Sequence, residues 1–138
     1  MLNHYQAGVC GNLYSLALGS VDNVFRFERD PERLATAVPE IYALPTLGDR
    51  VVLSIVDALI CQYEGENTIR LHDSSVLNEL RLSTDPVALD VLSVQELNRQ
   101  RQVAGLPINT NRFEIYPNAS ELELGVSDLS NIRIDRPK

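Results

Sequence analysis

The sequence predicts an α/β fold in which about four strands form a mixed sheet and about three to four helices pack on it. The first observation behind this prediction is the run at residues 50–57, whose Val, Leu and Ile content is typical of a strand covered on both faces. The second is a further strand at residues 76–82 that leads directly into a helix. Asp85 is a favoured N-cap residue, and Pro86 suits the first helical position because no N–H is needed there.

The chain has 138 residues, the size of one domain with one core, so residues 1–138 are predicted to form a single α/β domain. Hydrophobic residues make up 44% and charged residues 22%, as in globular proteins. The formal net charge of −7 opposes binding to nucleic acid and to anionic membranes. We therefore expect neither nucleic acid nor a membrane as a partner.

The first residues lack the positive region of a signal peptide, and no apolar run approaches the roughly 18 residues of a membrane span. These features predict a cytoplasmic protein. Cys10 and Cys61 lack the CxxC spacing of zinc or iron–sulfur ligands and are too few for a disulfide scaffold. Both are expected to be buried free thiols, and no iron–sulfur cluster is expected in this chain.

Two helices are predicted in the first third of the chain. Residues 7–18 place apolar side chains on one helical face, and Gly19 is expected to end that helix. Gly8 and Gly11 weaken this prediction and favour close backbone packing or a loop–helix junction there.

The second of these helices begins after Asp30, an N-cap residue followed by Pro31, and extends to Tyr42. Pro39 lies inside it, so a kink or an early end is expected there. The segment between the two helices, residues 21–29, is predicted as an exposed edge strand or a loop.

After the first central strand we expect a polar turn at 64–67 and a short strand at 68–71. The strongest helix prediction is 86–103, which Gly105 should end. A short helical stretch at 117–124 and a closing strand at 131–134 complete the predicted elements.

Several short motifs occur in a defined order along the chain: Asn12-Leu13-Tyr14, Asp57, Glu64-Gly65, Ser83 with Asp85, Ala88 and Asp90, and Leu124-Gly125 through Ile134. This order resembles the later half of domain-of-unknown-function family 362. The resemblance implies an α/β fold and a cluster of acidic residues without an assigned role. It implies no activity, because the family has none that could be transferred.

The sequence also departs from the family pattern. Gly11 stands where the family has Lys, and Glu66-Asn67 stand where it has Gly-Pro. The N-terminal α/β portion of the family domain and the cysteine-rich ferredoxin-like segment of many members have no counterpart in this sequence. The resemblance therefore implies a shortened form of the family domain.

Four acidic residues are placed where they could converge at one edge of the predicted sheet: Asp57 and Glu64 after the first strand, Asp85 and Asp90 around the helix start. With Asn12 they form the candidate ligand-binding set. Asp57, Glu64 and Asp85 form the candidate metal set, which suits Mg²⁺, Ca²⁺ or Mn²⁺ because these ions prefer oxygen ligands.

Structural alternatives stand beside these roles. Asp85 is expected to act as a helix N-cap rather than as a ligand, and Asp90 is expected to face solvent or bond a neighbouring backbone group. Asn12 could cap or bridge a turn, and His4 and His72 are expected on the surface rather than as metal ligands or bases.

No nucleotide-binding, acyl-transfer or zincin motif occurs, and no catalytic nucleophile can be nominated. Two functional hypotheses remain. The first is a non-catalytic assembly or interaction module, which we expect to be a homo-oligomer because a shortened domain leaves a sheet edge or face uncovered. The second is a metal- or small-molecule-binding domain with the acidic site. A third possibility, that the sequence is a piece of a longer protein, stays open.

Overall fold

The computed structural model describes residues 1–65, 68–111 and 113–136. Glu66 and Asn67, which belong to the predicted polar turn and to one departure from the family pattern, lie outside these ranges. The helices are α1 (Asn12–Gly19), α2 (Phe25–Glu28), α3 (Pro31–Tyr42), α4 (Pro86–Val103) and α5 (Ile115–Glu121). The strands are β1 (Asn3–His4), β2 (Gly8–Val9), β3 (Ser54–Gln62) and β4 (Ser74–Ser83), and 3₁₀ turns lie at Gly48–Arg50, Leu71–Asp73 and Leu129–Asn131.

The strands form two separate sheets. β3 and β4 make an antiparallel hairpin in which Ser54 pairs with Ser83 and Gln62 with Ser74, while β1 and β2 make a small second hairpin. The mixture of helices and strands is confirmed, but the single mixed sheet of about four strands is wrong. Two segments predicted as strands, 68–71 and 131–134, form no strand, and 3₁₀ turns overlap both of them.

The first central strand is displaced from its predicted position. It runs from Ser54 to Gln62 rather than over 50–57, so Asp57 lies inside the strand and not at its end. Val52, which precedes the strand, is 84% exposed. The interpretation of the β-branched run as a strand covered on both faces was therefore wrong. Among the residues that the structure describes, helices cover one face of this hairpin and its other face is exposed.

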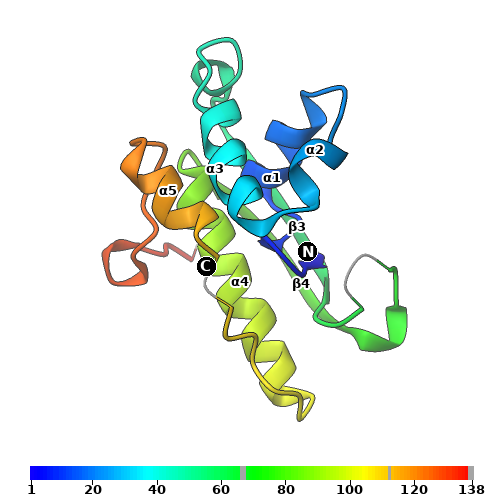
Figure 1. The fold of residues 1–138 in the computed structure, drawn as a ribbon. Coiled ribbons are helices and arrows are strands. Elements are labelled where there is room, and N and C mark those ends of the chain that lie inside the picture. Colours follow the sequence, from blue (N-terminus) through cyan, green and yellow to red (C-terminus); the bar gives the residue numbers. More distant parts are fainter. Residues whose placement is uncertain (66–67, 112, 137–138) are drawn as a thin grey trace.

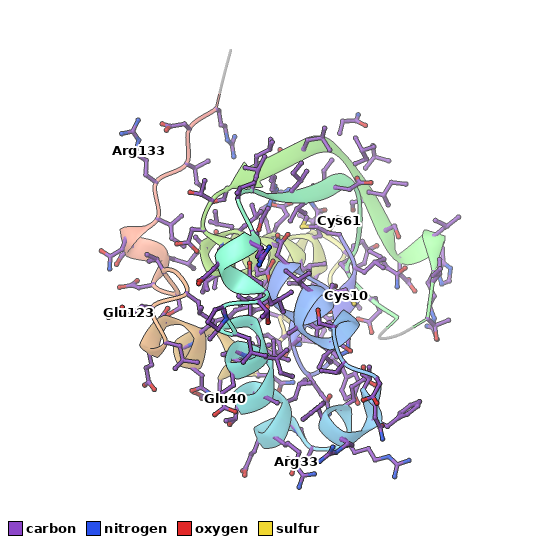
Figure 2. All side chains as sticks on the ribbon, turned by 90° about the horizontal axis from the view of Figure 1, so that it is seen from above. Cys10, Arg33, Glu40, Cys61, Glu123 and Arg133 are labelled. Atoms are coloured by element: carbon purple, nitrogen blue, oxygen red, sulfur yellow. The ribbon has the colours of Figure 1, made fainter. Side chains whose placement is uncertain are left out.

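The helices lie on that covered side (Figure 1), where α4 packs against both β3 and β4. Viewed from above in Figure 2, the hairpin forms one border of the molecule and the helices lie on its other side. The main core joins α1, α3, α4 and α5 through Leu13, Ala17, Leu34, Val38, Val87, Ile115 and Ala119. A smaller cluster of Val9, Cys61 and Leu97 connects α4 to the two hairpins.

The predicted helices at 30–42 and 86–103 are confirmed, with Asp30 and Asp85 as their N-caps. The early end at Pro39 is wrong, because α3 continues to Tyr42. Pro39 has no N–H to donate to the carbonyl of Ala35 four residues earlier. That carbonyl instead accepts from Asn118 Nδ2 at 3.0 Å, so α5 supplies the hydrogen bond that the proline removes.

The N-terminal helix begins at Asn12 rather than at residue 7 and ends at Gly19 as expected. Gly8 lies in β2 with φ 81°, a conformation that disfavours other residues and excludes helix. The predicted loop–helix junction at Gly11 is confirmed, since Gly11 is the N-cap position of α1. The segment at 21–29 includes the single-turn helix α2 instead of an edge strand.

Candidate functional site

Asp90 is a distant cap for helix α1. It lies on α4 and is 1% exposed, and its carboxylate accepts from the backbone N–H of Asn12 (2.8 Å) and of Leu13 (2.9 Å). Asn12 Nδ2 donates to the same carboxylate at 2.8 Å. The expectation that Asp90 faces solvent or bonds a neighbouring backbone group is wrong, because its partners lie 77 and 78 residues away.

Gly11 makes this cap possible. A Cβ atom at Gly11 would lie 2.4 Å from Cγ of Asp90, closer than non-bonded atoms approach. Burial raises the pKa of Asp90 to about 6, although the N–H groups of Leu13 and Asn12 act in the opposite direction. Asp90 and Asn12 therefore do lie together, but as a structural junction between α1 and α4.

Asp85 has two backbone partners. Its Oδ1 accepts from the N–H of Ala88 at 2.8 Å, which confirms the N-cap alternative. Its Oδ2 accepts from the N–H of Val126 at 2.9 Å, and a Cβ at Gly125 would lie 2.0 Å from Oδ1. Asp85 thus fixes both the start of α4 and the segment that follows α5.

Asp57 and Glu64 each have a local partner as well. Asp57 Oδ1 accepts from the N–H of Leu59 at 2.9 Å on the exposed side of β3. Glu64 forms an ion pair and hydrogen bond with Arg101 of α4. Each of these two carboxylates therefore has a hydrogen-bonding partner within the protein, which a carboxylate close to the protein interior requires.

The four acids do not converge. Within residues 1–65, 68–111 and 113–136, no three His, Cys, Asp or Glu side chains are grouped so that they could hold a metal ion. Binding of Mg²⁺, Ca²⁺ or Mn²⁺ by Asp57, Glu64 and Asp85 stays a prediction to which the structure adds no coordinating geometry.

One groove does bring two candidate residues together. It has a volume of about 870 Å³, lies along the outer edge of β3 beside α1, and is lined by both Asn12 and Asp57. Its other lining residues are mostly apolar, among them Leu16, Ile55, Leu59, Ile60, Ile69 and Leu71.

The outer side of the hairpin is the feature that the sequence analysis missed. The cross-strand pairs Ile55–Leu82, Asp57–Leu80 and Ile60–Val76 share the face that points away from α4. Together with Leu59, Ile69 and Leu71 at the edge of β3, these aliphatic residues are between 46% and 78% exposed. We call this surface the outer patch: Ile55, Leu59, Ile60, Ile69, Leu71, Val76, Leu80 and Leu82.

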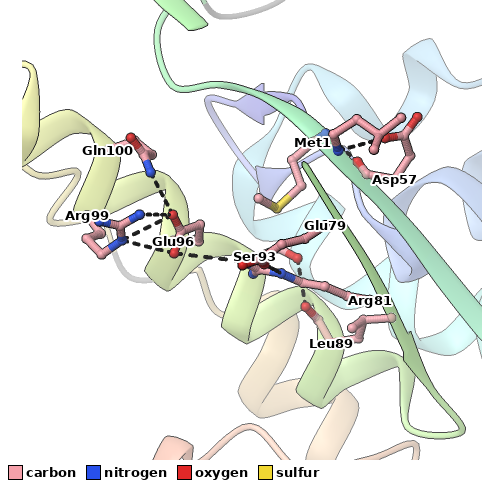
Figure 3. Close-up of polar contacts among 10 residues, drawn as sticks. Met1, Asp57, Glu79, Arg81, Leu89, Ser93, Glu96, Arg99 and Gln100 are labelled. Carbon is pink, nitrogen blue, oxygen red and sulfur yellow. Dashed lines mark hydrogen bonds and ion pairs between the residues drawn. The ribbon is translucent and has the colours of Figure 1, made fainter. Parts of the chain in front are cut away.

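The covered face of the same hairpin carries charges. Arg81 Nη2 lies 2.7 Å from Oε2 of Glu79 and 3.7 Å from Oε2 of Glu96 on α4 (Figure 3). Burial opposes ionisation of Glu96, but hydrogen bonds from Arg99 and Gln100 outweigh it and lower the pKa of Glu96. The alternation in residues 76–82 contained this signal, since its polar members Glu79 and Arg81 fall on the side opposite Val76, Leu80 and Leu82.

Two predictions about cysteine and histidine are wrong and two are confirmed. Cys61 is buried, whereas Cys10 is exposed. His72 is exposed and lies 3.1 Å from Asp73 Oδ2, whereas His4 is only 4% exposed. Nδ1 of His4 accepts from the N–H of Gln6 and of Ala7, and burial lowers the pKa of His4.

Across the part of the chain that the structure describes, no helix combines the length and the apolar character that a membrane crossing requires. Comparison with protein-family models, with curated proteins and with solved structures finds no match to this chain. The resemblance to domain-of-unknown-function family 362 therefore stays a prediction.

Proposed function

We propose that this chain is a non-catalytic assembly module that self-associates through the outer patch of the β3–β4 hairpin. The observation that supports this proposal is the orientation of the hairpin. Its charged residues Glu79 and Arg81 lie on the side of α4, whereas its aliphatic residues lie on the opposite face and along the edge of β3, where five of them also line the groove beside α1. Antiparallel sheets with one wet face normally show the reverse pattern.

The size of the outer patch supports a protein partner. Its eight aliphatic residues are each at least 46% exposed, whereas a typical monomer exposes no apolar patch larger than roughly 300–600 Å². A standard interface buries about 800 Å² on each partner. A second copy that places the same patch face to face would cover it, in the way that two sheets pack in a sandwich.

The test is the mass of the assembly for wild type and two matched variants. Ile55→Lys places a charge in the outer patch, and Val103→Lys makes the same change at a residue that is 73% exposed at the end of α4, outside the patch. Size-exclusion chromatography with light scattering at about 20 μM should show a wild-type oligomer, a smaller species for Ile55→Lys and no change for Val103→Lys. A wild-type monomer, or equal behaviour of the two variants, would contradict the proposal.

The groove along β3 supports a second candidate function, binding of a small molecule beside Asn12 and Asp57. Mostly apolar grooves of this size with a few polar groups are typical ligand sites. Native mass spectrometry of the purified protein, with and without Mg²⁺, Ca²⁺ or Mn²⁺, tests it. A bound species that is lost in Asp57→Asn would support this function, and an unliganded assembly would contradict it.

A further inference from the structure

The edge of β4 that faces away from β3 is open in the part of the chain that the structure describes. Within the described residues, β4 has a hydrogen-bonded neighbour on one side only, which is β3. The outer edge of β3 is partly covered, because Leu2 forms a parallel bridge with Gln62 and the N–H of Gln62 donates to the carbonyl of Met1 at 3.1 Å. Open strand edges are normally paired, covered or blunted. The outer edge of β4 is the side of this sheet at which a further strand can pair.

The direction of the backbone groups on this edge follows from β3. The carbonyl of Asp57 accepts from the amine of Met1 at 2.7 Å, on the side away from β4 (Figure 3). In an antiparallel pair the N–H and C=O of one residue point to the same side, so Asp57 and its partner Leu80 form a non-hydrogen-bonded pair. The N–H and C=O of Leu80 therefore point outward from β4.

The charges beside Leu80 select one register for a second copy of the strand. If two β4 strands pair antiparallel with Leu80 opposite Leu80, Glu79 of each copy lies opposite Arg81 of the other. A register centred on Glu79 would place two glutamates opposite each other, and one centred on Arg81 would place two arginines opposite each other. Like charges directly opposite destabilise a sheet, and opposite charges stabilise it.

We propose that β4 is a second self-association site, at which two copies pair antiparallel about a two-fold axis through Leu80 and form a four-stranded sheet. The two Leu80 residues then exchange both backbone hydrogen bonds. Pairing between the two β4 strands extends only a short way from Leu80 toward the N-terminal end of each strand. A bulge opposite Leu59 gives Asn78 a φ of 57° and interrupts regular pairing there. A two-fold contact of this kind closes on itself and does not propagate into a fibre.

The surroundings of β4 suit a partner strand of this charge. A groove of about 500 Å³ lies between residues Glu79–Ser83, helix α4 and the segment Ile132–Arg136. Its lining combines apolar side chains of α4, Leu89 and Leu92, with charges of both signs. The covered face of a second β4, which carries Glu79 and Arg81, would lie toward this lining.

The size of the complete assembly rests on the proposed function, because a tetramer requires the outer patch as well as the β4 edge. Edge pairing leaves the outer patches of two copies side by side on the same face of the four-stranded sheet, where they remain uncovered. Two such sheets that pack patch to patch form a closed tetramer with two kinds of two-fold interface. The expected assembly is therefore four chains of 15.4 kDa.

Charge reversal at the edge tests the inference separately from the outer patch. Glu79→Arg and Arg81→Glu each place like charges opposite each other in the two-fold register, so each variant alone should sediment as a dimer held by the outer patch. Mixing the two variants restores both opposite-charge pairs between chains, although each chain still carries like charges within itself. We expect the mixture to recover the tetramer, and native mass spectrometry of it to show mixed β4 pairs at least ten times more abundant than pairs of identical variants.

The two interfaces fail in distinguishable ways. Ile55→Lys should remain a dimer that is paired through β4, and this dimer should still respond to mixing of the charge variants. Ile55→Lys combined with Glu79→Arg should give a monomer, because both interfaces are then disrupted. A wild-type dimer that Ile55→Lys dissociates, and that mixing of the charge variants leaves unchanged, would overturn edge pairing and retain the outer patch. A wild-type assembly insensitive to Ile55→Lys would overturn the proposed function instead. Circular dichroism of each variant confirms that it is folded.

Discussion

The α1–α4 junction buries a charged side chain, whereas the outer patch exposes apolar side chains. At the junction a carboxylate, Asp90, is removed from water and receives three hydrogen bonds from Asn12 and Leu13. On the outer patch, large aliphatic side chains such as Leu80 remain in water without a covering element among the described residues. The junction is complete within one chain, whereas the patch requires a second surface. Changes at the junction should therefore alter stability at every protein concentration, and changes in the patch should act in a concentration-dependent way.

The largest expected effect is at the junction. Asp90→Ala leaves two N–H groups at the start of α1 without their acceptor in a buried site, so the free energy of unfolding should fall by about 2–4 kcal/mol. Urea denaturation measures this loss, which should be the same at low and high protein concentration. Asp128→Ala is the control, because Asp128 caps an exposed 3₁₀ turn through Ser130 and its removal should leave the midpoint nearly unchanged.

A smaller loss is expected from Gly11→Ala. The added Cβ would meet the Asp90 carboxylate at about 2.4 Å, so either α1 or α4 must shift. Overpacking of this kind costs about 1–3 kcal/mol. Gly19→Ala is the matched control, since a Cβ at Gly19 meets nothing within 4 Å. Equal denaturation midpoints for the two variants would contradict the described packing of Gly11 on Asp90.

The sequence predicted interactions between residues close together in the chain, but not interactions between residues far apart in the chain. Asp30 and Asp85 cap helices a few residues away, so their local patterns predicted α3 and α4 correctly. Asp90 caps a helix 77 residues away, and no spacing within α4 indicates that partner. The same limit applies at Pro39, where Asn118 from α5 allows α3 to continue. Local capping chemistry was predictable, and contacts between distant elements were not.

The strand prediction failed for a different reason. Residues 50–57 were interpreted from composition alone, as a buried parallel-type strand, and this placed Asp57 at a ligand-facing sheet edge. The hairpin instead exposes its aliphatic face, so composition did not indicate burial. The alternation of Val76, Leu80 and Leu82 with Glu79 and Arg81 was the available signal, but the sequence does not reveal that the charged side faces α4.

The stability of the α1–α4 junction should depend on pH. The pKa of Asp90 is raised to about 6 in the folded protein, above its value in the unfolded chain, so the folded state binds more protons between about pH 4 and 6. The contribution of Asp90 to the free energy of unfolding therefore increases as the pH falls through this window, by about 1 kcal/mol per pH unit.

Asp90→Asn removes this titration. The difference in unfolding free energy between wild type and Asp90→Asn should grow as the pH is lowered from about 6.5 to 4.5, which urea denaturation at several pH values will measure. A constant difference across this range would show that Asp90 titrates at its ordinary pKa, and would contradict the described burial.

The smallest effect is expected within the outer patch. Asp57 lies opposite Leu80 among aliphatic side chains, and patch-to-patch packing would remove its carboxylate from water. Asp57→Asn should therefore tighten self-association, by about threefold to tenfold in the dissociation constant measured by sedimentation. Asp49→Asn makes the same charge change in the Gly48–Arg50 turn, outside the patch, and should leave the dissociation constant unchanged.

The most direct test of the outer patch as a self-association surface is sedimentation equilibrium of the wild-type protein from about 0.5 to 50 μM. Self-association predicts that the average mass rises with concentration above the 15.4 kDa of one chain, toward a dimer or tetramer. A mass that stays at 15.4 kDa over the whole range would contradict it, because the outer patch would then remain in water without a partner copy.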